Sequence, residues 1–303
     1  ALVVGINEYA RPDVSPLRFA VNDAQCMAKA LVEAGGFPPG NVTLMTSESE
    51  ELLKPTLGNV IFALNRLARQ VRARDLFLFY FSGHGISLDG EPYLLTLDAD
   101  ARSADTLEVS SLRVDLLREK LRAVPAAADI LVMDACQNDP QGGRSLSGNL
   151  LTEEFVKGIQ VVPTGTEPPT AEQRVMALLF ACSIGQRAYE SPGTKQGIFT
   201  HQLVAGLRGD AKGQTGAVTV GSLADFVGSK VPEATERLLG AGRKQVPSVV
   251  YVPDEDRPRK LILIPEQAPV GPSVPLPPPP TPIVRPPQEV LDKAECVIVI
   301  PSM

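Results

Sequence analysis

Four segments of the chain are short runs of apolar residues rich in β-branched and aromatic side chains. They lie at residues 1–6, 76–81, 130–133 and 175–181. Their length and composition are typical of strands that are buried on both faces of a sheet. We therefore predict four central strands, which the segments between them must connect.

Between these runs, apolar residues recur with the spacing of amphipathic helices. The spacing predicts helices over residues 22–36, 56–73, 114–124, 197–209 and 220–239. In the first of them Asn22 is the expected N-cap, followed by Gln25, and Gly35 is the expected stop. Strands that alternate with helices predict an α/β fold, in which helices cover both faces of a mostly parallel central sheet.

Polar or unusual residues follow each predicted strand at once. The four stretches are "NEY", "SGHG", "DACQND" and "CSIGQ". Since ligands of such sheets bind beyond the carboxyl ends of the strands, we expect the chemistry at one edge of the sheet. His84, one of only two histidines, lies between Gly83 and Gly85. We interpret these glycines as a sharp turn that leaves the imidazole and the backbone N–H groups accessible.

Cys136 lies in the polar stretch "DACQND". A buried packing role is the commoner fate of a free cysteine. The polar neighbours favour a nucleophile instead, because an imidazole at the next strand end, such as that of His84, can hold or accept the proton of the thiol.

Composition narrows the function classes. The net charge is −6, and no block of Lys and Arg appears, which disfavours a nucleic-acid surface and adsorption to an anionic membrane. No apolar run approaches the length of a membrane span. The four cysteines are widely spaced without a CxxC pair, so we expect reduced thiols in a cytoplasmic protein rather than a zinc site or a disulfide framework.

Two segments do not fit a compact core. Residues 140–173 are rich in Gly, Pro, Ser and Thr, and a loop of that length is usually functional or disordered. Residues 265–287 include "PLPPPPTP", which is typical of a polyproline linker. We expect one globular domain over residues 1–264, and a tail at 288–303 that either starts a further domain or packs back as a strand.

The motifs together resemble the caspase-like cysteine peptidases of family C14, most closely the metacaspase and bacterial orthocaspase branch. The resemblance covers most of residues 1–255 and runs through "ALVVGINEY", "LRFAVNDAQCMAKAL", "FYFSGHGISLDGEPYLLTLDAD", "ILVMDACQNDP" and "LLFACSIGQRAYES". It implies a caspase-like sandwich, with a large-subunit-like part up to about residue 140 and a small-subunit-like part over residues 174–264.

The resemblance also implies roles at the predicted strand ends. It makes Cys136 the nucleophile and His84 the general base and acid, and it assigns the oxyanion hole to the N–H groups of Gly85 and Cys136. The expected reaction is peptide hydrolysis through an acyl-enzyme, without a metal or other cofactor.

Substrate choice follows from the same resemblance, because metacaspase-like enzymes use acidic residues to select Arg or Lys before the scissile bond. The matching positions are Asp23 and Asp134, and two carboxylates can hold a guanidinium by charge-assisted hydrogen bonds. For Asp23 an ordinary helix acid in the first turn is an equal alternative. Ser183 matches a segment that lines the same subsite.

An enzyme that prefers basic residues would find its own sites in and beside the 140–173 loop. Exposed loop tips are where nicking concentrates. We predict autoprocessing after Arg144 or Lys157, with Arg174 as a third candidate that abuts the next strand. The alternative is a loop that any protease would cut.

The remaining candidates favour ordinary roles. We interpret Cys26 and Cys182 as packing residues and His201 as an ordinary helix residue. Some metacaspases need calcium, but Gly142 and Gly143 fall about where an acidic ligand would be expected. The acids of the stretch "LDGEPYLLTLDAD" are therefore interpreted as turn residues: Asp89, Asp98 and Asp100.

The leading hypothesis is a cysteine endopeptidase whose partner is a peptide or protein with Arg, then Lys, before the scissile bond. We expect neither a nucleic-acid nor a membrane partner. The alternative is a catalytically weak caspase-like module that binds or scaffolds. A redox thiol protein is disfavoured, because no resolving cysteine lies near Cys136 in sequence.

Overall fold

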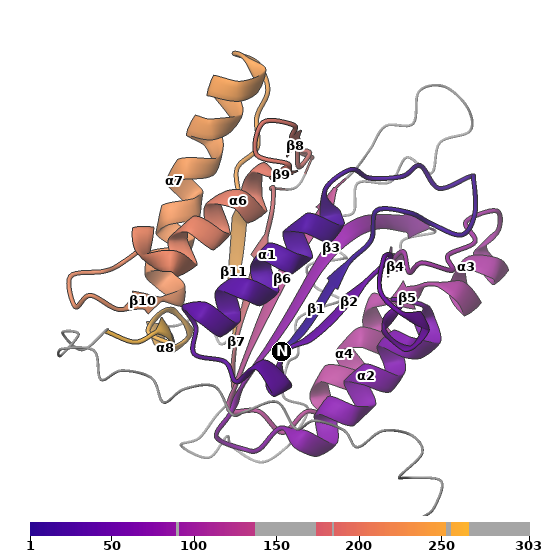
Figure 1. Cartoon of the computed structure of the whole chain (residues 1–303), viewed down its shortest axis with the longest axis horizontal. Coiled ribbons are helices and arrows are strands. Elements are labelled where there is room, and N and C mark those ends of the chain that lie inside the picture. Colours follow the sequence, from indigo (N-terminus) through magenta and orange to yellow (C-terminus); the bar gives the residue numbers. More distant parts are fainter. Residues whose placement is uncertain (89–90, 137–173, 184, 253–255, 267–303) are drawn as a thin grey trace, which may run out of the picture. The chain divides into compact units, whose positions relative to one another are not determined.

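The computed structural model describes residues 1–88, 91–136, 174–183, 185–252 and 256–266, which Figure 1 shows in colour. Contacts divide the chain into one unit, Ala1–Gln267, and a second, Ala268–Met303, which lies outside the described residues. The loop at 140–173 and the tail at 288–303 also lie outside them, as does the proline-rich segment 265–287 apart from its first two residues.

The first unit is built on a central sheet with the strand order β11-β7-β6-β3-β1-β2. Its strands are β1 (Leu2–Gly5), β2 (Thr43–Thr46), β3 (Leu76–Leu88), β6 (Ala128–Cys136), β7 (Val175–Phe180) and β11 (Ser248–Val252). All neighbours are parallel except β11, which runs antiparallel to β7. Two short strands, β4 (Glu91–Leu94) and β5 (Leu112–Arg113), extend the sheet beside the far end of β3.

Helices cover both faces of this sheet (Figure 1). One face carries α1 (Ala20–Glu33), α6 (Ile198–Ala205) and α7 (Val220–Leu239), and the other carries α2 (Leu57–Gln70) and α4 (Val114–Arg122). The smaller elements are α3 (Ala104–Ser110), α8 (Asp256–Arg259), a π-helical turn (Gly206–Asp210), and the strand pairs β8 (Glu190–Ser191) with β9 (Gln196–Gly197) and β10 (Val218–Thr219) with β12 (Ile262–Ile264).

The alternation of side chains along β3 divides the core into two. Tyr80 packs with the residues of α1, α6 and α7, whereas Phe79 and Phe81 pack with those of α2 and α4. All three side chains are fully buried, as expected of a strand with helices on both sides. The prediction of an α/β fold with a mostly parallel, doubly covered sheet is confirmed.

The four predicted strands are all present, but the prediction missed several others. It missed β2, whose sequence "TLMT" is short, and β11, whose five residues are all half-buried. Neither segment has the long buried run that marked the central strands.

The predicted glycine turn at His84 is wrong. β3 continues without a break through Gly83, His84 and Gly85 to Leu88. The reason is pairing on both sides of these residues. β6 accompanies β3 as far as His84, and β4 pairs with it from Gly85 onward, so the backbone stays extended where the loss of bulky side chains had indicated a turn.

The predicted start of the first helix is also wrong, because α1 begins at Ala20 rather than being capped by Asn22. Side chains from distant segments satisfy its first N–H groups. The Glu190 carboxylate accepts from the N–H groups of Arg18 and Phe19 at 3.1 and 2.9 Å, and the Asn7 side chain accepts from that of Val21 at 3.0 Å. Tertiary contacts thus replace the local cap.

Candidate active site

The carboxyl ends of β3 and β6 bring the two predicted catalytic residues into register. In the parallel pairing of these strands His84 is the partner of Cys136, and Ser82 is the partner of Asp134. Side chains two apart along a strand share a face of the sheet. The side chain of His84 therefore lies on the same face as that of Asp134, which is the face that carries α1 and α6.

The imidazole of His84 is buried and held by backbone atoms. Its Nε2 lies 2.7 Å from the carbonyl oxygen of Ser15, and because a carbonyl can only accept, Nε2 carries a hydrogen. In the neutral ring the lone pair is then on Nδ1. The backbone N–H of His84 donates to the hydroxyl of Tyr9 at 2.7 Å, and the two rings lie 5.2 Å apart between centroids.

Gly83 makes room for this arrangement. A Cβ at Gly83 would lie 3.2 Å from the Tyr9 hydroxyl and 2.9 Å from the nearest carbon of the Phe81 ring. A glycine is therefore needed here for close approach rather than for a turn. Tyr9 and Ser15 were not predicted. Tyr9 lies in the noted "NEY" stretch, but Ser15 contributes only its carbonyl, which has no signature in the sequence.

The two predicted acidic residues converge on one glycine. Asp23 on α1 and Asp134 on β6 are both buried, with exposed fractions of 2% and 1%. A Cβ at Gly197 would lie 2.8 Å from Asp134 Oδ2 and 3.0 Å from Asp23 Oδ2. Both oxygens of Asp23 also accept from the backbone N–H of Gly197, at 3.0 Å. The bare Cα of Gly197 thus lies between two carboxylates.

This arrangement places two carboxyl groups next to each other in a buried site. Burial, reinforced by the charge of Asp134 and more weakly by that of Glu190, raises the pKa of Asp23 well above its usual range. A bound cation would offset both effects. Asp23 does lie in the first turn of α1, but its carboxylate is buried and bonded to a residue 174 positions away, unlike a surface acid that complements the helix dipole.

Ser183 follows β7, and its hydroxyl donates to the carbonyl of Val246 at 2.9 Å. Cys26 and Cys182 are poor nucleophiles. Burial raises the pKa of Cys182 to about 12, and burial together with the charge of Asp23 raises the pKa of Cys26. His201 lies on α6 with its Nδ1 2.9 Å from the side-chain oxygen of Gln196.

Arg174 lies at the opposite, amino-terminal end of the strands. Its guanidinium pairs with the buried carboxylate of Asp129 and donates to the carbonyl of Leu121 at 2.7 Å. The side chain is thus held inside the fold. The other two predicted cleavage positions, Arg144 and Lys157, lie outside the described residues.

Asp98 and Asp100 have local partners. Asp98 accepts from the Thr96 hydroxyl at 2.8 Å, and Asp100 pairs with Arg102 and Arg11. Asp89, Gly142 and Gly143 lie outside the described residues. In the part of the chain that the structure describes, no three His, Cys, Asp or Glu side chains cluster as a metal site requires.

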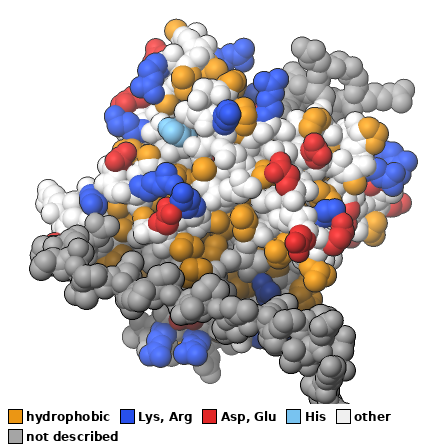
Figure 2. Space-filling view, viewed as in Figure 1, with side chains coloured by type: hydrophobic (Ala, Val, Ile, Leu, Met, Phe, Trp, Pro, Cys, Tyr) orange, Lys and Arg blue, Asp and Glu red, His pale blue; other side chains and the backbone are white. Residues whose placement is uncertain are grey.

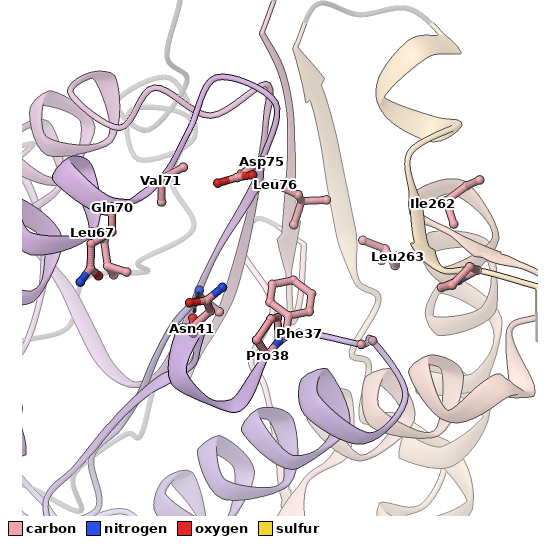
Figure 3. A pocket seen from close by; sticks show the side chains of 14 residues that line it. Phe37, Pro38, Asn41, Leu67, Gln70, Val71, Asp75, Leu76, Ile262 and Leu263 are labelled. Atoms are coloured by element: carbon pink, nitrogen blue, oxygen red, sulfur yellow. Dashed lines mark hydrogen bonds between the residues drawn. The ribbon is translucent and has the colours of Figure 1, made fainter. Parts of the chain in front are cut away.

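Hollows lie at both edges of the sheet, and the largest among the described residues, of about 890 Å³, lies near the start of β6 and β7, lined by Ala128 and Val175 among others. A cavity of about 490 Å³ lies at the amino-terminal edge, lined by Phe37, Leu76 and Leu263 among others, and Figure 3 shows that its lining is mostly apolar. A smaller hollow of about 360 Å³ lies beside the start of α1, between Arg18 and Glu190. Only this smaller hollow is next to the site.

On the face that Figure 2 shows, basic and acidic side chains are intermixed rather than gathered into a patch of one charge. None of the helices within the described ranges is both long and apolar enough to cross a bilayer.

Comparison with known proteins identifies the family of this chain. The caspase domain family (peptidase C14) matches residues 1–254. A probable protease of a Desulfuromonadales bacterium is 31% identical over 226 residues, which cover 69% of this chain and 26% of that protein. Metacaspase-7 of Arabidopsis thaliana is 28% identical over 185 residues, which cover 59% of this chain and 41% of that protein.

Among solved structures, a protein of Geobacter sulfurreducens has a TM-score of 0.54 at 20% identity, covering 82% of this chain and 91% of that chain. This likeness shows the fold alone. The chain spans 26% and 41% of the lengths of the two relatives named above. The family match covers most of the chain, however, and the chain therefore belongs to the caspase domain family of cysteine peptidases.

Proposed function

We propose that this domain is a cysteine endopeptidase that cleaves after arginine, and less readily after lysine, through Cys136 and His84. The observation that carries the basic preference is the pair of buried carboxylates, Asp23 and Asp134, on either side of Gly197. A guanidinium satisfies two such carboxylates by charge-assisted hydrogen bonds and neutralises their mutual repulsion.

The chemistry follows from the orientation of His84. Its Nε2 is committed to the Ser15 carbonyl, so Nδ1 accepts the proton of the Cys136 thiol. The thiolate attacks the scissile carbonyl carbon, and the N–H groups of Gly85 and Cys136 stabilise the oxyanion. As the C–N bond breaks, Nδ1 returns the proton to the leaving amine, which leaves a thioester. Water, deprotonated by the same nitrogen, then hydrolyses the thioester and frees the thiol.

We further propose that the enzyme processes its own chain after Arg144 or Lys157. The ion pair of Arg174 with Asp129 supports the choice of these two residues over Arg174, because a side chain that is engaged in the fold is a poor substrate. The predicted cytoplasmic location stays a prediction.

The test uses fluorogenic peptides with Arg, Lys, citrulline or Asp before the reporter. The wild type should cleave the Arg peptide fastest and the Lys peptide more slowly, and Cys136→Ala should cleave neither. Citrulline keeps the shape of arginine without its charge, so weak cleavage of that peptide supports recognition by charge. A preference for Asp would contradict the acidic subsite, and no turnover of any peptide would favour a binding module.

A further inference from the structure

A chain of buried hydrogen bonds lies behind one of the two carboxylates. The hydroxyl of Thr200 on α6 donates to Asp134 Oδ2 at 2.6 Å, and the hydroxyl of Tyr80 on β3 lies 2.6 Å from that of Thr200. The exposed fractions of Tyr80, Thr200 and Asp134 are 0%, 0% and 1%. The chain thus links two strands and a helix out of reach of solvent.

The direction of these bonds follows from the donor inventory. An ionised Asp134 can only accept, so Thr200 uses its single hydrogen toward the carboxylate, and its oxygen must accept from Tyr80. Tyr80 keeps its proton, because burial, together with the charges of Asp23 and Asp134, raises its pKa well above the usual range. Tyr80 therefore donates to Thr200, and Thr200 in turn donates to Asp134.

The two acids are held by different donors. Asp134 receives a hydrogen bond from the Thr200 side chain, whereas Asp23 receives one from the backbone N–H of Gly197. A hydrogen bond donated to a carboxylate fixes its orientation as well as favouring its charged form. The orientation of Asp134 beside Gly197 therefore depends on the Thr200 hydroxyl.

We propose that Thr200 and Tyr80 are positioning residues for substrate specificity, which hold the Asp134 carboxylate in its orientation toward Gly197, on which Asp23 also converges. The proposal rests on the proposed function, since it concerns the subsite for the basic side chain. It goes beyond that function by assigning the Arg preference partly to two buried neutral residues that act through Asp134.

The chain offers a matched control in Thr235 on α7. Its side chain is also fully buried, and its hydroxyl donates to the carbonyl of Val231 within the same helix, at 2.8 Å. Thr235→Val and Thr200→Val therefore remove the same group from the same side of the sheet. Only the second removes a bond to Asp134.

The experiment measures kcat/KM for the Arg and citrulline peptides in Thr200→Val, Thr200→Ser, Tyr80→Phe and Thr235→Val. Thr200→Val should lower kcat/KM for the Arg peptide about 10- to 100-fold, which is the range for a lost hydrogen bond to a charged group. It should leave kcat/KM for the citrulline peptide nearly unchanged. Thr200→Ser should restore the preference, and Tyr80→Phe should reduce it less. Thr235→Val should behave as the wild type.

Two outcomes would overturn the proposal, and they differ from failure of the proposed function. An unchanged ratio of Arg to citrulline cleavage in Thr200→Val would show that Thr200 does not set specificity. Equal losses on both peptides, with slower alkylation of Cys136, would indicate a general structural role. If the wild type itself did not prefer Arg over citrulline, the acidic subsite would be wrong, and the positioning role would fall with it.

Discussion

His84 on β3 and Cys136 on β6 are direct partners in the parallel pairing of two neighbouring central strands. Both strands are buried between two helix layers, so strand pairing places the two backbone positions side by side. The orientation of the imidazole also depends on the loop between β1 and α1, because Nε2 of His84 lies 2.7 Å from the Ser15 carbonyl.

The first prediction concerns this dyad. Cys136→Ala should lower kcat/KM for the Arg peptide by at least about 10⁴-fold, and His84→Ala nearly as much. Because the two groups act as a unit, the double variant should be little worse than either single one. Steady-state kinetics with active-site titration would check this, and robust turnover by Cys136→Ala would contradict the assignment.

The second prediction concerns the reactivity of the cysteines. Iodoacetamide at pH 7 should alkylate Cys136 much faster than Cys182, since the Cys182 side chain is buried and burial raises its pKa to about 12. Cys26, whose pKa is also raised, should react slowly. Peptide mapping by mass spectrometry gives the three rates. His84→Ala should slow only the reaction of Cys136, and equal slowing of all three would point to a general change in the fold.

The third prediction concerns the carboxylates. Asp134→Asn should cost about 2–5 kcal/mol in kcat/KM for the Arg peptide, because it removes one partner of a desolvated charge pair. The rate of Cys136 alkylation should change far less. A loss that is equal for the Arg and citrulline peptides would mean that Asp134 acts on the thiol rather than on the basic side chain.

The fourth prediction concerns pH and stability. Since the pKa of Asp23 is raised in the folded chain, the folded state binds more protons than the unfolded state, and stability falls as pH rises from about 4 through the raised pKa. Asp23→Asn should therefore have a higher Tm than the wild type at pH 7, and the difference should shrink toward pH 4. Thermal unfolding across this range tests the sign, and a lower Tm at pH 7 would contradict it.

The fifth prediction concerns Gly197. Gly197→Ala should place a methyl group between the two carboxylates and so impair cleavage after Arg, and the overpacking should destabilise the fold by about 1–3 kcal/mol. Gly228→Ala is the control, because a Cβ at this position in α7 meets nothing within 4 Å and should stabilise the helix by about 0.5–1 kcal/mol. Equal activity of the two variants would exclude Gly197 from the subsite.

Autoprocessing has its own test, in which purified wild type should convert to two fragments with time while Cys136→Ala stays intact. Mass spectrometry should place the new ends after Arg144 or Lys157. Cleavage after Arg174 would require its ion pair with Asp129 to open. Equal nicking of both proteins would point to a contaminating protease.

The sequence by itself determined the layered α/β fold and singled out the segments proposed to carry the chemistry. Both depend on local properties: the buried runs at 76–81 and 130–133, the helical spacing between runs, and scarce residues such as His84 directly after a buried run. Hydrophobic periodicity is a property of each segment alone, so it can be recognised without knowing which other segments pack against it.

Tertiary structure decided how these segments meet. β3 extends through Gly83 because β6 and β4 pair with it, and α1 starts at Ala20 because Glu190 caps it from far along the chain. The convergence of Asp23 and Asp134 on Gly197, like the bond from His84 to the Ser15 carbonyl, joins groups distant in sequence. Packing in three dimensions decides which hydrogen-bond partners of this kind meet. A backbone carbonyl or N–H is present at almost every position, so the residue types do not reveal which of these groups will be used.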